Sequence, residues 1–212
     1  MVNAPPPLAD AAEALARGEI VVLPTDTIYG LAAKPDVPGA TERLFRAKSR
    51  ARSLTLPVLV GDLAAARDVA VFNDIAERAA RAWWPGAATL VLDRTSRSRA
   101  WDLGDEQATI GVRVPDEPLA LELLRTTGPL AVTSANRSGD PPGRTCEDLL
   151  RTFGETVAIY LCRDDPLDGV ASAVLDLTVS PPRVVRPGAL PSEAVRRFIE
   201  GQDPLLDSRT LR

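Results

Sequence analysis

The chain has 212 residues, of which 45% are hydrophobic and 25% are charged, and its net charge at pH 7 is −4. This length and composition are typical of one globular domain with a sizeable core, and the acidic balance argues against a nucleic-acid module that binds through bulk positive charge. Histidine is absent, which excludes Ser-His-Asp and Cys-His nucleophiles and removes the commonest ligand of transition metals.

The hydrophobic pattern predicts strands that alternate with helices along the chain. The predicted helices cover residues 8–17, 39–48, 62–83, 116–128, 145–154 and 191 to about 200. The predicted strands cover residues 19–23, 54–60, 87–93, 108–115, 129–134, 156–161, 171–177 and 182–187. We expect the helix at 62–83 to break near "VFND", with Asn73 capping its second piece, and the helix at 116–128 to have an acidic first turn. Some connections are too short for crossovers, so we expect a single-domain α/β fold with a mixed sheet flanked by helices.

Two further expectations concern the compartment of the protein and the ends of the chain. Cys146 and Cys162 have neither metal-ligand spacing nor a redox CxxC arrangement. No signal peptide is visible, and the apolar runs are far shorter than the ~20 residues of a membrane helix, so we expect a cytoplasmic protein without membrane contact. A disulfide is not expected in that reducing compartment. We place the folded domain at 5–195 and a C-terminal tail at 196–212.

Polar or cationic side chains lie at or near the ends of four predicted apolar strands. Thr25, Asp26 and Thr27 follow the strand at 19–23, and Arg113 lies near the end of the strand at 108–115. The strand at 129–134 ends in the "TSAN" segment with Ser134 and Asn136, and the strand at 182–187 ends near Arg186. Any one of these strand ends is also consistent with a simple turn. Four of them together favour a ligand site, because ligands collect at strand ends in α/β sheets.

A cationic cluster, Lys48, Arg50 and Arg52, follows the predicted helix at 39–48. Cations in a last helical turn also complement the helix dipole, which is the alternative interpretation. Lysine occurs only at positions 34 and 48, and we interpret Lys34 as an incidental surface cation. Together with Arg113 and Arg186, the cluster is consistent with a pocket for a polyanion. The chain has no Walker A loop, and no GxGxxG follows a strand, so any nucleotide would be bound by another design.

These segments resemble the threonylcarbamoyl-AMP synthase family, the YrdC-like proteins of tRNA modification. The resemblance covers residues 8 to about 195, with the family's order and spacing, and seven segments carry it. They are "LPTDTIYGL" (23–31), "AKSR" (47–50), "WWPGAATLVL" (83–92), "GVRVPDEP" (111–118), "TSANRSGDPP" (133–142), "ASAVLDL" (171–177) and "RVVRPGAL" (183–190).

The resemblance implies a twisted mixed sheet around a large, positively charged cavity. It implies that L-threonine, bicarbonate and ATP, with Mg²⁺ on the phosphates, give threonylcarbamoyl-adenylate and pyrophosphate. The product would pass to transfer proteins that form N6-threonylcarbamoyladenosine (t6A) on tRNA, with possible RNA contact. This chemistry brings anions together, so positioning and fixed positive charge are its main requirements.

The family's site residues carry over only to matching positions. Lys48, Arg50, Ser134 and Asn136 match an ATP-binding catalytic set, and Arg186 matches an arginine on the ATP side. Thr25 and Thr27 match the threonine-binding loop, Arg113 the arginine for the substrate carboxylate, and Ser172 a serine of a "PSTV"-like segment. That segment is "ASAV" here, so a threonine hydroxyl is lost at Ala173, and "AKSRARSLTLP" lacks the family's usual prolines.

Some alternatives stay open at this point. We expect Asp26 to cap its own turn through an Asx bond, with a contact to the substrate ammonium as the alternative. The protein would be the synthase, an RNA-binding module of the same fold without catalysis, or an enzyme with another carbamoyl donor or acceptor. ATP consumption that depends on both threonine and bicarbonate would separate the three functions.

Overall fold

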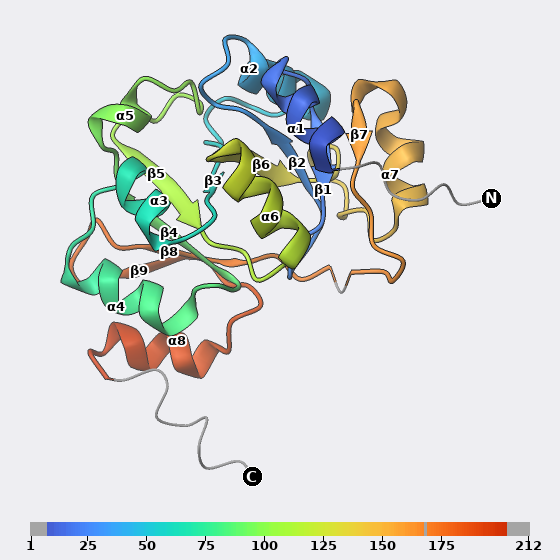
Figure 1. Ribbon diagram of the computed structural model, residues 1–212. Coiled ribbons are helices and arrows are strands. Elements are labelled where there is room, and N and C mark those ends of the chain that lie inside the picture. Colours follow the sequence, from blue (N-terminus) through green and yellow to red (C-terminus); the bar gives the residue numbers. More distant parts are fainter. Residues whose placement is uncertain (1–7, 168, 203–212) are drawn as a thin grey trace.

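The computed structural model describes residues 8–167 and 169–202, in which helices surround one sheet (Figure 1). The helices are α1 (Leu8–Ala16), α2 (Ala40–Lys48), α3 (Leu63–Val69), α4 (Asp74–Trp83), α5 (Ser96–Arg99), α6 (Pro118–Thr127), α7 (Cys146–Phe153), the 3₁₀ helix η1 (Gly154–Thr156) and α8 (Ser192–Ile199). The strands are β1 (Val21–Leu23), β2 (Gly30–Ala33), β3 (Val58–Leu59), β4 (Ala88–Asp93), β5 (Thr109–Arg113), β6 (Leu130–Ser134), β7 (Ile159–Tyr160), β8 (Ala173–Asp176) and β9 (Arg183–Arg186). No helix in the described ranges has the length and apolar character that crossing a membrane requires.

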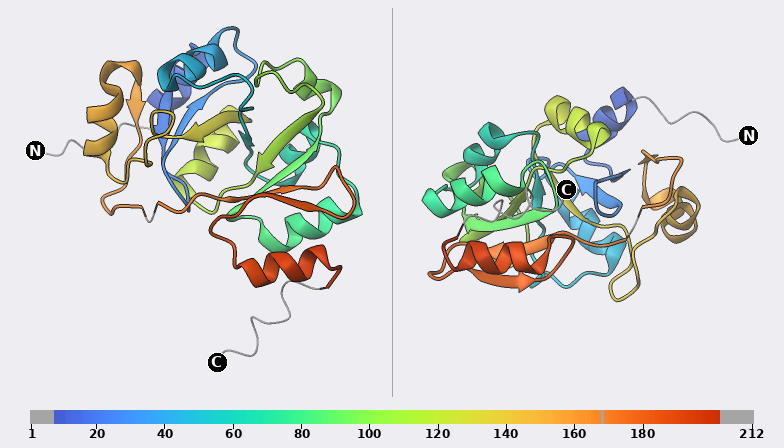
Figure 2. Two further views of the ribbon diagram at one scale, coloured as in Figure 1. Left: turned by 180° about the vertical axis from the view of Figure 1, so that it is seen from behind. Right: turned by 90° about the horizontal axis from the view of Figure 1, so that it is seen from below.

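The strands form one mixed sheet in the order β7-β1-β2-β6-β3-β5-β4-β8-β9. Five neighbouring pairs run antiparallel, and the pairs β1–β7, β3–β5 and β4–β8 run parallel. The strands turn relative to one another along the sheet, as the two views in Figure 2 show. The predicted fold class, a twisted mixed sheet flanked by helices, is therefore confirmed.

Strand alternation divides the core between the two faces of the sheet. In β1, Val21 and Leu23 pack with α1 and α6, whereas Val22 points into the larger cluster on the other face. That larger cluster also takes apolar side chains from α2, α3, α4, α7 and α8. Because helices cover both faces, the short strands read as apolar runs in the sequence.

Most predicted elements are found with shorter bounds, and three were missed, among them the 3₁₀ helix η1. The break before α4 is confirmed, since Asn73 Oδ1 accepts the N–H of Ala76 at 2.9 Å. The predicted strand at 54–60 shrinks to the two residues of β3, and neither β2 nor α5 was predicted. The prediction of an acidic first turn for the helix at 116–128 is wrong. The helix α6 begins only at Pro118, so Asp116 and Glu117 precede it.

The expected boundary between domain and tail falls inside α8. Phe198 in this helix is buried, and its ring lies 4.7 Å from that of Trp83, measured between centroids. The helix therefore belongs to the packed domain as far as Ile199. The expected domain start at 5–7 and the tail at 203–212 lie outside the described residues.

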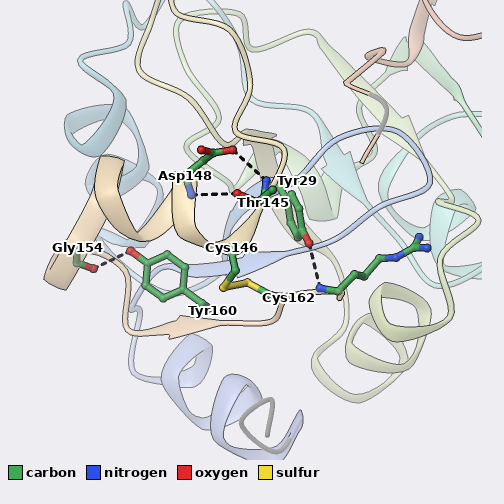
Figure 3. The surroundings of a disulfide bond; sticks show 8 residues. Tyr29, Thr145, Cys146, Asp148, Gly154, Tyr160 and Cys162 are labelled. Carbon is green, nitrogen blue, oxygen red and sulfur yellow. Dashed lines mark hydrogen bonds between the residues drawn. A yellow bond between two sulfur atoms is a disulfide. The ribbon is translucent and has the colours of Figure 1, made fainter. Parts of the chain in front are cut away.

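The expectation of no disulfide is wrong in this structure. Cys146 and Cys162 are bonded to each other, with their Cα atoms 5.6 Å apart (Figure 3). Cys146 begins α7 and Cys162 lies just beyond β7. The helix, turn and strand between them therefore bring the two ends of this unit together. Disulfides are rare in reducing compartments, but the fold of this unit brings the two thiols together, which their spacing in the sequence does not reveal.

We expect reduction of this bond to lower the stability of the domain. Its cysteines are 16 residues apart, and for a loop of about that size the chain-entropy relation gives about 3 kcal/mol. Urea unfolding of the wild-type protein with and without a reductant would measure the loss. The double variant Cys146→Ser/Cys162→Ser should match the reduced protein and show no response to the reductant. An unchanged wild-type midpoint on reduction would contradict the expectation.

Candidate functional site

A cavity of about 420 Å³ opens on one side of the sheet. Small-molecule sites typically occupy roughly 300–1,000 Å³. The walls come from the β1–β2 loop, segment 50–57 and strands β4, β5, β6, β8 and β9. The predicted site residues that line it are Thr25, Thr27, Arg50, Arg113, Ser134, Ser172 and Arg186. The structure thus gathers seven of the nine predicted site residues around one space.

Strand alternation explains how an apolar sheet presents polar groups to this space. In β5, Thr109, Gly111 and Arg113 line the cavity, while Ile110 and Val112 between them enter the core. A single run of residues therefore serves both the core and the site.

The departure from the family pattern at Ala173 leaves the cavity wall intact. Ser172 and Val174 line the cavity, and Ala173 lies between them on β8 with its side chain buried. A threonine hydroxyl at that position would point away from the cavity. Ser172 Oγ instead lies 2.9 Å from the hydroxyl of Thr89, a second cavity residue that sequence reasoning missed. The alternation of Thr89 with Leu90 inside "AATLVL" was the signal that could have identified it.

The hydroxyls of the β1–β2 loop form a chain with a defined direction. Thr25 Oγ1 donates to the carbonyl of Ile28 at 2.6 Å, so its single proton is used. Thr27 must then donate in the 2.9 Å bond between the two threonine hydroxyls. Arg113 Nη1 in turn donates to Thr27 Oγ1 at 2.9 Å. Both hydroxyl protons are therefore used within the loop. Thr25 Oγ1 also accepts the N–H groups of Thr27 and Ile28, so Thr27 Oγ1 is the hydroxyl with an acceptor position left for a ligand.

Tyr29 and Gly30 complete the inner end of this loop. Tyr29 is fully buried and its hydroxyl accepts the backbone N–H of Arg163 at 2.9 Å, beside the disulfide in Figure 3. A Cβ on Gly30 would lie 2.5 Å from Val132 Cγ1, so only glycine lets β2 approach β6 this closely. Tyr29 and Gly30 therefore form part of the cavity wall.

The Asx turn that was preferred for Asp26 is not formed. The N–H of Ile28, which such a turn would use, donates to Thr25 Oγ1 at 3.1 Å. Asp26 Oδ1 accepts instead from Arg113 Nη2 at 2.6 Å and from the backbone N–H of Asp116 at 2.9 Å. The turn is capped by Thr25, which leaves the carboxylate of Asp26 available for contacts with a distant strand.

Arg113 is a buried cation held by three acceptors. Its Nε donates to the carbonyl of Gly86 at 2.9 Å, in addition to the bonds with Thr27 and Asp26. Burial lowers the pKa of Arg113, the charge and hydrogen bond of Asp26 raise it, and the nearby Arg186 lowers it. Two of its five N–H groups are not used by these three bonds. Arg113 lines the cavity, so these two groups are hydrogen-bond donors that an anionic ligand there could use.

Arg50 and Arg186 place two more guanidinium groups at the cavity. Arg50 donates to the carbonyls of Leu54 (2.8 Å) and Thr55 (3.2 Å), which closes the loop where the family's prolines are missing. Arg186 donates to the carbonyl of Ser172 at 2.9 Å. Burial lowers the pKa of both arginines, and the positive charge of Arg186 lowers that of Arg50 further. Such mutual repulsion is what an anionic ligand would relieve.

Lys48 lies behind the cavity wall and organises it. The side chain is buried, and Nζ donates to the carbonyl of Ser134, to the carbonyl of Asn136 at 2.7 Å and to Asn136 Oδ1 at 3.0 Å. Ser134 Oγ lies 3.4 Å from the same nitrogen. Burial, followed by the charge of Arg50, lowers the pKa of Lys48 to about 8. The predicted Lys48, Ser134 and Asn136 set is thus brought together, with Ser134 as the member that lines the cavity.

Two other cations of the sequence pattern lie outside the site. Arg52 forms ion pairs with Glu42, Asp102 and Asp105 on the surface, so it does not extend the cationic pocket. Lys34 donates to the carbonyl of Thr127, the last residue of α6, at 2.7 Å, which is a helix-end contact.

Comparisons with known proteins point to one family. The Sua5/YciO/YrdC family model, described as "Telomere recombination", matches residues 13–188. A putative threonylcarbamoyl-AMP synthase of Mycobacterium tuberculosis (strain H37Rv) is 40% identical over 193 residues, which are 91% of this chain and 88% of the relative.

Two solved structures share the fold. The P. abyssi Sua5 structure complexed with L-threonine matches with a TM-score of 0.83 and 30% identity, over 92% of this chain and 58% of that one. The structure of E. coli YciO matches with a TM-score of 0.81 and 28% identity, over 88% of this chain and 91% of that one. The chain therefore spans about the length of YciO and little more than half of the P. abyssi protein.

Proposed function

The chain belongs to the Sua5/YciO/YrdC family, and we propose that it is a nucleotidyltransferase, an L-threonylcarbamoyladenylate synthase. It would form threonylcarbamoyl-AMP and pyrophosphate from L-threonine, bicarbonate and ATP. The observation that carries this proposal is one cavity that three arginines line together with the hydroxyl-bearing β1–β2 loop. The arginines can donate hydrogen bonds to the anionic groups of a ligand, and Thr27 Oγ1 can accept one from an amine or hydroxyl of the same ligand.

The reaction has two steps, and each makes a specific demand on the cavity. First, the amine of threonine attacks bicarbonate, which gives a carbamate and releases water. The carbamate oxygen then attacks the α-phosphorus of ATP, and pyrophosphate leaves. All the reacting groups except the amine are anions, so fixed positive charge and correct placement supply most of the rate enhancement.

The side chains divide between the two substrates. Arg113 takes the threonine carboxylate, and Thr25, Thr27 and Ser172 line the threonine end. Arg50, Arg186 and Ser134 take the ATP phosphates, while Lys48 fixes Ser134 and Asn136 and adds positive charge behind them. The distances of Arg113 to Thr27 and of Lys48 to Asn136, 2.9 and 2.7 Å, support these assignments by fixing each cation in place.

ATP would enter as its Mg²⁺ complex. In the described ranges no three Asp, Glu, Cys or His side chains gather where they could hold a metal ion. Mg²⁺ keeps several waters and is often bound mainly through substrate phosphates, which fits this donor set.

The proposed setting is the cytoplasm, where the product would pass to the proteins that complete t6A on tRNA. Pyrophosphate release tests the proposal, measured with all three substrates and with each one omitted. Release that requires both threonine and bicarbonate supports the synthase. ATP use that ignores threonine would indicate another acceptor, and RNA binding without pyrophosphate release would indicate the non-catalytic module.

We expect serine to be a poorer substrate than threonine, but only modestly so. The two differ by one methyl group, which is worth about 1–3 kcal/mol in a pocket, or roughly 10–200-fold in kcat/KM. Competition between the two amino acids in the pyrophosphate assay measures the ratio of their kcat/KM values. Glycine, which lacks both the methyl group and the hydroxyl, serves as a control. Equal kcat/KM values for serine and threonine would exclude threonine as the designated substrate.

A further inference from the structure

Asp26 is the one carboxylate among the three acceptors that hold Arg113. The other two, the Gly86 carbonyl and the Thr27 hydroxyl, are neutral. Thr27 is itself fixed through Thr25, whereas Asp26 is fixed by the backbone N–H of Asp116 at 2.9 Å. The side chains of Arg113 and Asp26 are 6% and 17% exposed, so their 2.6 Å contact is largely shielded from water.

The same contact joins three segments that are distant in the sequence. Asp26 belongs to the β1–β2 loop, Arg113 ends β5, and Asp116 leads into α6. The next residue, Glu117, pairs with Arg163 at 3.0 Å, and the backbone N–H of Arg163 donates to the Tyr29 hydroxyl. The loop is therefore fastened at both ends to the segment before α6, directly at Asp26 and through Arg163 at Tyr29.

We propose that Asp26 is a positioning residue that acts on the amino-acid substrate through Arg113. By fixing Nη2, it leaves the two unused N–H groups of Arg113 in one orientation, toward the substrate carboxylate. This inference rests on the proposed function, because it takes an amino acid as the ligand of Arg113. The position of the acceptor oxygen matters more than its charge, since a second carboxylate close to the substrate carboxylate repels it.

The predicted consequence is a difference between two substitutions at this position. Asp26→Asn keeps an acceptor oxygen for Arg113 and Asp116, so the threonine Kd should stay within about 3-fold of the wild-type value. Asp26→Ala removes the acceptor that fixes Nη2 and leaves the guanidinium held by Gly86 and Thr27 only, so the threonine Kd should rise about 10- to 30-fold. The Kd for ATP should change little in both variants. Asp36→Ala, which removes a carboxylate paired with Lys34 at 3.5 Å, serves as the matched control.

A double-mutant cycle tests whether Asp26 acts through Arg113. Calorimetric titration of threonine compares the wild type, Asp26→Ala, Arg113→Ala and the double variant, and thermal melts check that each is folded. In the Arg113→Ala background, Asp26→Ala should cost no further affinity. If Asp26→Ala is too unstable to titrate, Asp26→Ser, whose hydroxyl is too short to reach Arg113, takes its place.

Three results would overturn the proposal. An Asn variant as weak as the Ala variant would mean that the charge of Asp26 matters, as in a direct contact with the substrate ammonium. Additive losses in the cycle would mean that Asp26 acts independently of Arg113. A wild-type threonine Kd in Asp26→Ala would remove any role in binding. By contrast, a wild-type protein that binds no threonine would count against the proposed function itself.

Discussion

Replacing Lys48 by methionine is expected to lower kcat/KM by at least about 10²-fold and also to destabilise the fold. Methionine fills similar space but has no ammonium to donate to the Ser134 carbonyl and to the two Asn136 oxygens. Each buried acceptor left without a donor costs about 1–3 kcal/mol. The turn that carries Ser134 into the cavity would then lose its anchor. Pyrophosphate release and thermal melts measure the two effects.

Arginine at this position is the informative comparison. It keeps the positive charge, but a planar guanidinium cannot occupy a site built around one compact nitrogen, so most of the activity should still be lost. Lys34→Met is the matched control, because it removes the only other lysine, which touches a helix end away from the cavity. Turnover near the wild-type level in Lys48→Arg would contradict the role assigned to Lys48.

The pH profile distinguishes an ammonium that acts in the site from one that only supports the fold. Since the pKa of Lys48 is lowered to about 8, the free enzyme loses this charge as the pH rises through 8. The kcat/KM for ATP, which reports the free enzyme, should therefore fall above that pH. Bound polyphosphate favours the charged form and raises the pKa, so the corresponding fall in kcat should come at higher pH. If kcat/KM and kcat fell at the same pH, bound phosphate would not be raising the pKa of Lys48.

The site could be predicted from the sequence through the segments that match the family and, for Arg113, through strand alternation, which fixes side-chain direction. Arg113 stands between Val112 and Val114, and that pattern alone places it opposite the core. Ser134 was predicted from its place at the end of a strand, in the "TSAN" segment that matches the family. The sequence does not show that the Lys48 ammonium points toward backbone carbonyls. Every residue has a carbonyl, and only the fold decides which of them lie near Lys48. The motif placed Lys48 at the site, and only the fold assigns it to the 134–136 turn.

The missed elements have equally specific causes. β2 reads "GLAA", with no β-branched or aromatic residue, so intrinsic preference gave no signal and pairing with β1 and β6 determines its conformation. The disulfide depends on the return of β7 beside the start of α7, a relation between segments that residue spacing does not contain. Asp26 was misjudged because its partner, Arg113, is 87 residues away. In each case a long-range contact outweighed the local preference.

Replacing Arg113 by alanine is expected to raise the threonine KM by about 10²-fold, with a much smaller effect on the ATP KM. The guanidinium is buried and held by Gly86, Thr27 and Asp26, so its remaining N–H groups meet a carboxylate without reorganisation. Lysine at this position should recover little, because one ammonium cannot satisfy three fixed acceptors and a carboxylate together.

The control for Arg113 is another arginine of the cationic pattern. Arg52→Ala removes a guanidinium that pairs with surface carboxylates outside the cavity, so both KM values should stay near those of the wild type. Steady-state pyrophosphate release with each substrate varied in turn gives the comparison. If the ATP KM rose in Arg113→Ala while the threonine KM stayed constant, Arg113 would belong to the phosphate end of the cavity. The carboxylate would then have to be held by Arg50 or Arg186, the other guanidinium groups that line the described cavity.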